Sequence, residues 1–181
     1  MLAYKGFNIG YVCRGYQFDK EKVNRTDRAK CVRDGFHAAL NPLDCFSYYP
    51  DPSHAVYCLV ECSGDIHEDC SDTKIACTEL RIVKELSMSE MMIHAIAYME
   101  KHKEERGHSR ISKNKGTARN GFALVFGSNP IANGSMGDVL AFAQTSRNGK
   151  IVGINVMTVG KDGIKPHVDY NIKGDIADAY L

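Results

Sequence analysis

Three glycine sites beside aromatic residues constrain the start of this chain more than any other feature. They are Tyr4-Lys5-Gly6-Phe7, Cys13-Arg14-Gly15-Tyr16 and Gly35-Phe36-His37-Ala38, and the third runs into Asn41-Pro42-Leu43-Asp44. Glycine tolerates a left-handed backbone and the close approach of other groups. We therefore expect a small head built around tight turns, with Gly6, Gly35 and Phe36 as structural residues and Gly35 in a left-handed conformation.

The length and charge of the chain limit the class of protein to which it can belong. Its 181 residues make one large domain or two small ones, and 44% hydrophobic residues are enough for a buried core. The formal net charge of +1 excludes a global field that draws the protein onto nucleic acid or an anionic membrane. No segment approaches the roughly 20 apolar residues that cross a bilayer, and the start does not resemble a signal peptide. We predict a soluble, cytoplasmic protein.

All seven cysteines lie between Cys13 and Cys77. An odd number without a secretion signal favours reduced thiols, and a buried free cysteine packs like a small hydrophobic residue. A zinc site is the alternative interpretation, and its candidate ligands are Cys58, Cys62, His67, Cys70 and Cys77. Structural zinc sites usually contain two tightly spaced cysteine pairs, and only Cys58 and Cys62 have such spacing. We therefore expect no bound metal.

Residues 1–86 are expected to form a head of mixed secondary structure. Strand-forming residues are concentrated in the ranges 1–7, 55–62 and 74–86. Asn41 followed by Pro42 has the pattern of an N-cap and the first residue of a short helix.

An amphipathic helix is predicted for residues 87–106. Ser87 and Glu90 have the spacing of a capping box, and Gly107 ends the pattern. Apolar residues recur at helical spacing, at Met88, Met91, Met92, Ala95, Ile96 and Met99. This stripe is expected to pack in a core, although a methionine-rich face can also bind adaptable partners.

Residues 107–120 are expected to form a flexible, basic connector. The segment has no acidic residue, and its basic residues are separated by Ser, Asn, Gly and Thr. It could contact an acidic surface or a phosphate backbone, but it lacks the interleaved aromatic residues that stack on bases. The candidate partner-binding residues are Arg106, Arg110, Lys113, Lys115 and Arg119.

Residues 121–181 are expected to form antiparallel β-structure. Apolar strand patterns cover 122–126, 138–145 and 151–159, and a last strand is expected at 167–172. Asn148-Gly149 between two of them is a strong hairpin pattern, because both residues tolerate a positive φ. The predicted fold class is therefore α+β: a small mixed head, one long amphipathic helix and an antiparallel β C-terminal part.

The chain resembles an uncharacterised family of phage and prophage proteins. The head carries the resemblance in Y-K-G-F at residues 4–7, G-F-H at 35–37 and N-P-L-D at 41–44. The C-terminal part carries it in G-D-V-L at 137–140 and N-G-K-I at 148–151. Many members follow the head with glycine-rich β repeats, so this chain looks like a short form. The resemblance implies a phage origin and the cytoplasm of a host bacterial cell, and it supplies no cofactor or catalytic residue.

The head is also similar to ADP-ribosyltransferase-like domains in the order of its strands and short helix. That similarity implies NAD as a cofactor, with Tyr4, Lys5, His37 and Tyr48 as the site residues. The sequence departs from the family pattern, because no His or Arg opens the first strand and no Ser or Thr follows His37. Glu61 and Glu79 are both candidates for the glutamate that completes such a site.

These features together predict a small phage-encoded protein that binds and inhibits a bacterial defence component, such as a CRISPR effector, without catalysis. Its partner would be a host defence protein or ribonucleoprotein, met through the basic connector; direct binding of nucleic acid is less favoured. The first alternative is an ADP-ribosyltransferase-like enzyme that modifies a host protein. The second is a virion accessory protein whose β part assembles into oligomers. The sequence contains no phosphate-binding glycine loop, nucleophile elbow or zinc-protease motif.

Overall fold

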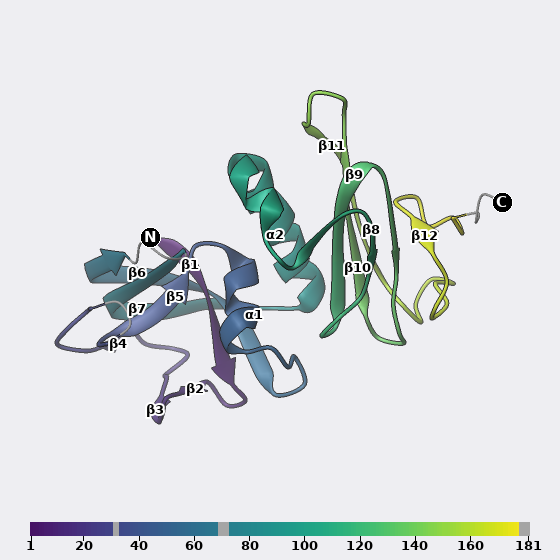
Figure 1. The fold of residues 1–181 in the computed structure, drawn as a ribbon. Helices are drawn as coiled ribbons and strands as arrows, with labels where there is room; N and C mark the ends of the chain where they lie inside the picture. Colours follow the sequence, from purple (N-terminus) through teal and green to yellow (C-terminus); the bar gives the residue numbers. More distant parts are fainter. Residues whose placement is uncertain (31–32, 69–72, 178–181) are drawn as a thin grey trace. The chain divides into compact units, whose positions relative to one another are not determined.

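A computed structural model describes residues 1–30, 33–68 and 73–177, and the chain divides into two compact units, Met1–Ser87 and Met88–Leu181 (Figure 1). Among the described residues, 49% lie in strands and 15% in helices. The predicted α+β class is therefore wrong, and the fold is largely β-sheet. The difference arises because polar stretches such as 63–68 and 111–117 lie within strands. No helix in the described ranges is long and apolar enough to span a membrane.

The first unit is built on a seven-stranded sheet. Its strands are β1 (Leu2–Asn8), β2 (Val12–Cys13), β3 (Tyr16–Gln17), β4 (Asn24–Arg25), β5 (Phe36–Ala39), β6 (Ala55–Glu68) and β7 (Lys74–Leu86). Four of them pair in a closed cycle, because β1 and β7 each pair with both β5 and β6. Buried side chains from all four strands form one core, including Phe7, Phe36, Val60, Ile75 and Leu80.

A helical segment leads from β5 towards β6 and positions two tyrosines. It consists of the 3₁₀ helix η1 (Pro42–Asp44) and the four-residue helix α1 (Cys45–Tyr48). Oδ1 of Asn41 accepts a hydrogen bond from the Leu43 N–H at 3.0 Å, and Pro42 opens the helix, which confirms the predicted cap. Phe46 is fully buried, and both helices pack against β1. Tyr48 and Tyr49 therefore lie beside this strand.

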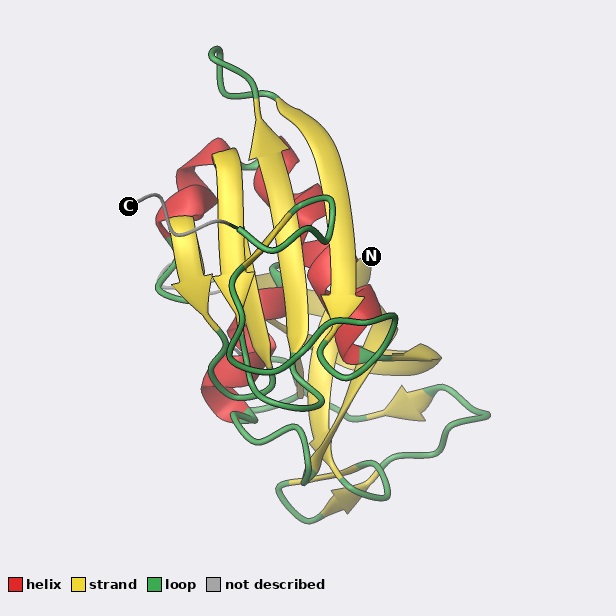
Figure 2. Cartoon of the chain, turned by 90° about the vertical axis from the view of Figure 1, so that its right-hand side faces the viewer, coloured by secondary structure: helices red, strands yellow, loops and turns green. Residues whose placement is uncertain are grey.

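The second unit is a five-stranded sheet with one helix packed on it. Its elements are α2 (Met88–Lys101), the 3₁₀ helix η2 (Lys103–Gly107), β8 (Ile111–Thr117), β9 (Phe122–Asn133), β10 (Val139–Thr145), β11 (Ile151–Thr158) and β12 (Tyr170–Asn171). The strands follow the order β11-β10-β9-β12, with β8 on β9, and Figure 2 shows them side by side. α2 packs on β10 and β11, and its methionine stripe is buried at Met91, Met92 and Met99. The expectation that this stripe belongs to a core is confirmed.

The helix and the connector both differ from their predictions. The prediction of a long amphipathic helix over 87–106 is wrong. α2 ends at Lys101, because the backbone of His102 is not helical (φ −121°, ψ 81°). The flexible connector expected over 107–120 is also wrong, since β8 pairs with β9 along much of that segment. A strand with a solvated face needs few apolar residues, so its composition resembled that of a loop.

The antiparallel arrangement predicted for the C-terminal part holds only in places. β10 and β11 form the predicted hairpin through Asn148-Gly149, with Gly149 at φ +77°. β9, however, pairs in parallel with both β8 and β10, so the sheet is mixed. The last strand, expected at 167–172, covers only Tyr170–Asn171.

Candidate functional site

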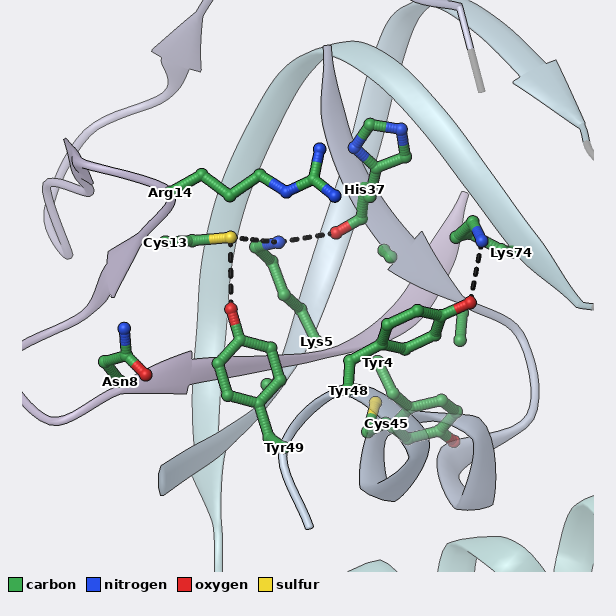
Figure 3. A pocket seen from close by; sticks show the side chains of 13 residues that line it. Tyr4, Lys5, Asn8, Cys13, Arg14, His37, Cys45, Tyr48, Tyr49 and Lys74 are labelled. Carbon is green, nitrogen blue, oxygen red and sulfur yellow. Dashed lines mark hydrogen bonds between the residues drawn. The ribbon is translucent and has the colours of Figure 1, made fainter. Parts of the chain in front are cut away.

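A cavity of about 470 Å³ opens in the first unit where β1 and β5 separate. The two strands pair only at Tyr4 and Ala39, so Gly6 and His37, the next antiparallel partners in this register, remain apart. The described residues that line the cavity include no carboxylate. The side chains labelled in Figure 3 are those of Tyr4, Lys5, Asn8, Cys13, Arg14, His37, Cys45, Tyr48, Tyr49 and Lys74.

Lys5 fills the gap between the two strands, and only 5% of the residue is exposed. Its Nζ donates a hydrogen bond to the carbonyl oxygen of His37 at 2.7 Å and lies 3.6 Å from Sγ of Cys13 (Figure 3). The same atom lies 5.2 Å and 5.4 Å from the ring centroids of Phe7 and Phe18. None of these contacts is with a carboxylate. Because a buried charge is costly unless it is paired, the position suits an anion that supplies the missing negative charge.

Two more cations and a histidine surround the same space. Lys74 Nζ donates to the hydroxyl of Tyr48 at 2.7 Å, and Arg14 comes from a left-handed turn (φ 48°) after β2. Burial, and then the positive charges of Lys5, Arg14 and Lys74, lower the pKa of His37. The imidazole is therefore neutral near neutral pH, with burial as the larger cause of its lowered pKa and the three neighbouring cations adding to it.

Tyrosines form the other wall of the cavity. The Tyr49 hydroxyl donates to Sγ of Cys13 at 3.1 Å, and its ring lies directly on the backbone of Gly6. A Cβ on Gly6 would lie 2.4 Å from Cδ2 of Tyr49, which explains why glycine is needed there and confirms its structural role. Burial raises the pKa of Tyr4. Tyr48 is 53% exposed, so a planar ligand could stack on its ring.

The cysteines of this unit differ in accessibility. Cys13 is partly exposed in the cavity, whereas burial raises the pKa of Cys45 to about 12 and makes that thiol inert. Of the zinc candidates, Cys58, Cys62 and Cys77 are buried, and Cys70 lies outside the described residues. Within the described part of the chain, no three His, Cys, Asp or Glu side chains are placed to hold a metal ion.

The four residues predicted for the enzymatic alternative lie together, since Tyr4, Lys5, His37 and Tyr48 all line the cavity. The two candidate glutamates do not line it. Glu61 forms an ion pair with Arg81 at 2.7 Å, and Glu79 forms one with Arg25. The carboxylate that an ADP-ribosyltransferase site needs is therefore absent from the described lining.

Sequence reasoning missed Cys13, Arg14, Tyr49 and Lys74, which line the same cavity. The first two belong to the second glycine site, and Tyr49 follows a predicted site residue, so the sequence contained a usable signal for these three. Lys74 begins β7, and nothing in its local sequence distinguishes it from a solvated lysine.

The five predicted partner-binding residues do not form one surface. The Arg106 side chain is only 14% exposed, pairs with Glu100 at 2.9 Å and donates to the Gly149 carbonyl at 2.7 Å. It stabilises the second unit rather than facing a partner. Lys113 is exposed. The other three, Arg110, Lys115 and Arg119, line a second cavity.

A cluster of Asp51, Ser53 and His54 has the composition of a hydrolase triad but not its geometry. Nδ1 of His54 contacts both the Ser53 hydroxyl at 2.9 Å and Asp51 at 2.7 Å. A triad uses the two ring nitrogens separately, one for the nucleophile and one for the carboxylate. The His54 side chain is also 81% exposed, so this cluster is a hydrogen-bonded turn.

Comparison with known proteins gives a match for the unit that holds the first cavity. A family model described as a domain of unknown function, DUF7666, matches residues 1–94, which is more than half of the 181 residues. No curated protein matches the chain, and no solved structure matches it. The matched range contains β1 to β7 and every residue that lines the cavity. The chain therefore belongs to the DUF7666 family.

Proposed function

We propose that the first unit binds a nucleotide in the cavity between β1 and β5. The observation that carries this proposal is that Lys5, Arg14 and Lys74 meet at one concave site whose described lining has no carboxylate. Phosphate groups are anionic and accept several hydrogen bonds, and lysine and arginine are their usual protein partners. The volume of about 470 Å³ lies within the range of small-molecule sites.

The tyrosine wall supports a nucleoside rather than a bare phosphate. Tyr48 offers an exposed ring, and Lys74 Nζ lies 4.8 Å from its centroid. A base that stacks on such a ring gains about 1–3 kcal/mol, and the lysine holds the ring beside the phosphate-binding cations. The base would lie against Tyr48, and the phosphates would lie towards Lys5 and Arg14.

NAD is one nucleotide that these cations suit, because it carries a diphosphate. Transfer of its ADP-ribose group passes through a cationic sugar, which a nearby carboxylate stabilises in glycosidic chemistry. Glu61 and Glu79 are held in ion pairs elsewhere. We therefore propose binding without group transfer, and time-dependent ADP-ribosylation of host proteins would contradict this part.

Inhibition of a bacterial defence component, the role predicted from the sequence, stays a prediction. It needs no catalysis and is compatible with a nucleotide-binding head. Charge reversal at Arg110, Lys113 and Arg119 tests contact with a partner separately from the first cavity, which none of these residues lines. Lys115 is left unchanged in that test because it pairs with Asp169 at 2.6 Å.

Calorimetric titration with ADP, NAD and adenosine tests the nucleotide proposal. We expect the two phosphorylated ligands to bind at least tenfold more tightly than adenosine, which corresponds to about 1.4 kcal/mol. Arg14→Gln should weaken ADP about tenfold without affecting the fold, since Arg14 is exposed and makes no hydrogen bond or ion pair with the described residues. The matched control is Lys22→Gln, because the Lys22 side chain is 79% exposed and, among the described residues, forms an ion pair only with Asp19.

Cys13 provides a second, independent measurement of occupancy. Its thiol lines the cavity and is partly exposed, so bound ADP should slow its alkylation by iodoacetamide, measured by mass spectrometry of the Cys13 peptide. Equal affinity for adenosine and ADP, or alkylation of Cys13 that ADP does not slow, would overturn the proposal.

A further inference from the structure

The second unit contains a cavity of its own, formed where β8 folds back on itself. Four residues of extended strand span about 13 Å, yet a Cβ on Gly116 would lie only 2.9 Å from Cβ of Ser112. The reversal is at Asn114, which has φ +65° and meets Gly127 of β9. A cavity of about 630 Å³ lies beside this reversal.

The lining of this cavity is polar and positively charged. Its described lining residues include three cations but no carboxylate, and several hydroxyl groups. The residues that matter here are Ser109, Arg110, Ser112, Lys115, Thr117 and Arg119. Guanidinium, ammonium and hydroxyl groups are all donors, and together they match the acceptor-only oxygens of phosphate.

Lys115 is held in place by a neighbouring carboxylate. Its Nζ lies 2.6 Å from Oδ2 of Asp169, whose other oxygen accepts a hydrogen bond from Asn133 at 2.5 Å. An ammonium has three donors, so this pair orients Lys115 and leaves donors for a ligand. Arg119 is exposed, and its guanidinium makes no ion pair with the described residues.

The lining differs from that of the first cavity in its aromatic content. Phe122 is the one aromatic residue among the described residues that line it, and it is 4% exposed. A base therefore has no exposed ring on which to stack, which disfavours a nucleoside and single-stranded nucleic acid. We infer that this cavity binds small, multiply phosphorylated ligands, so that the second unit is a phosphate-binding unit distinct from the proposed nucleotide site.

The test uses the full chain and inorganic tripolyphosphate as the probe. Titration is carried out in the Arg14→Gln background, which weakens binding at the first cavity. We expect saturable binding of one tripolyphosphate, and Arg119→Gln should weaken it at least tenfold. Lys113→Gln is the matched control, because Lys113 is exposed on the same strand but does not line the cavity, and it should change the affinity less than twofold.

Three results would overturn the inference. The first is that tripolyphosphate shows no saturable binding, and the second is that Arg119→Gln and Lys113→Gln lose equal affinity for it. The third is that a single-stranded oligonucleotide binds more tightly than tripolyphosphate and loses affinity in the same Arg119→Gln variant. The last result would assign the cavity to nucleic acid. The Arg119→Gln protein should still bind ADP, and ADP should still protect Cys13 from alkylation. This control separates failure of the second cavity from failure of the first.

Discussion

The two cavities of this protein both contain three cationic side chains, but at different depths. In the first, Lys5 is 5% exposed and lies among aromatic rings without a carboxylate. In the second, Lys115 has a side-chain exposure of 61% and is paired with Asp169. A buried, unpaired ammonium destabilises a fold unless something else favours it. If the two proposals are compared, this contrast predicts that the first cavity selects its anion more strictly than the second.

The largest expected effect is a loss of stability, compared between one glycine substitution in the first unit and one in the second. Gly35 has φ +94°, and a Cβ there would lie 3.0 Å from the Arg28 carbonyl oxygen and from Cα of Ala29. Gly35→Val should therefore lower the free energy of unfolding of the first unit by at least about 3 kcal/mol, from backbone strain and overpacking together. Calorimetric melting of the full chain measures this loss.

Gly163→Val in the second unit is the control for that melt. Gly163 has a similar φ of +81° but no atom within 4 Å of a Cβ, so only the backbone strain of about 1–2 kcal/mol applies. Equal losses for the two variants would show that contacts at Gly35 contribute nothing.

Removal of the buried charge tests the contrast between the cavities directly. Lys5→Met keeps the length and volume of the side chain but removes its charge. We expect ADP binding to fall about 100-fold, about 2.7 kcal/mol, while the melting temperature stays the same or rises, because an apolar replacement of a buried charge is often stabilising. Lys115→Met should weaken tripolyphosphate only about fivefold, since the Lys115 ammonium is exposed and is already paired with Asp169.

If Lys5→Met and Lys115→Met lose comparable affinity for their ligands, the burial of Lys5 does not distinguish the two cavities. A Lys5→Met protein that melts far below the parent would instead mean that Lys5 stabilises the fold through its bond to the His37 carbonyl.

How far the sequence predicted these features depended on whether the signal was local. The Asn41 cap, the Asn148-Gly149 hairpin and the left-handed Gly35 follow from residues adjacent in the chain, and all three are confirmed. The parallel pairing of β9 with β8 and β10 could not be predicted in this way, because it is a contact between separate strands and depends on how the whole sheet assembles.

The first cavity was predictable in part for the same reason. Lys5 and His37 stand within glycine motifs, whereas Lys74 reaches the site only because β7 pairs with β5. Three of the predicted basic residues, Arg110, Lys115 and Arg119, line the second cavity, but their polar segment was interpreted as a linker. Asp169, which holds Lys115, is far away in sequence and could not have been anticipated.

The pH dependence of binding provides a smaller effect at the first cavity. Burial and the charges of Lys5, Arg14 and Lys74 lower the pKa of His37 below the usual imidazole value of about 6.5, against the opposing charge of Asp34. A bound diphosphate favours the protonated imidazole, so NAD affinity should rise about threefold or more between pH 7.5 and pH 5.5. His37→Gln should abolish this rise, and calorimetry across that pH range measures it.

The same shift in pKa fixes the sign of the stability change without ligand. Between the lowered pKa of His37 and about 6.5, the unfolded chain binds a proton that the folded chain does not. The contribution of this group to stability is therefore complete above that range and is lost as the pH falls through it. A first unit whose melting temperature rises on acidification, and does so only when His37 is present, would contradict this assignment.

The smallest expected effect is a difference between the two cavities in the salt dependence of their affinity. It is measured with the same probe at both cavities. Tripolyphosphate is titrated in the Arg119→Gln background for the first cavity and in the Arg14→Gln background for the second. At 0.1 M salt the screening length is about 10 Å, and exposed charges are screened much more than buried ones. Raising the salt from about 50 mM to about 200 mM should therefore weaken the second cavity about fivefold and the first only about twofold. If the two cavities respond equally, the depth of Lys5 has no electrostatic consequence for the ligand, and the contrast between a specialised and a general anion site would be lost.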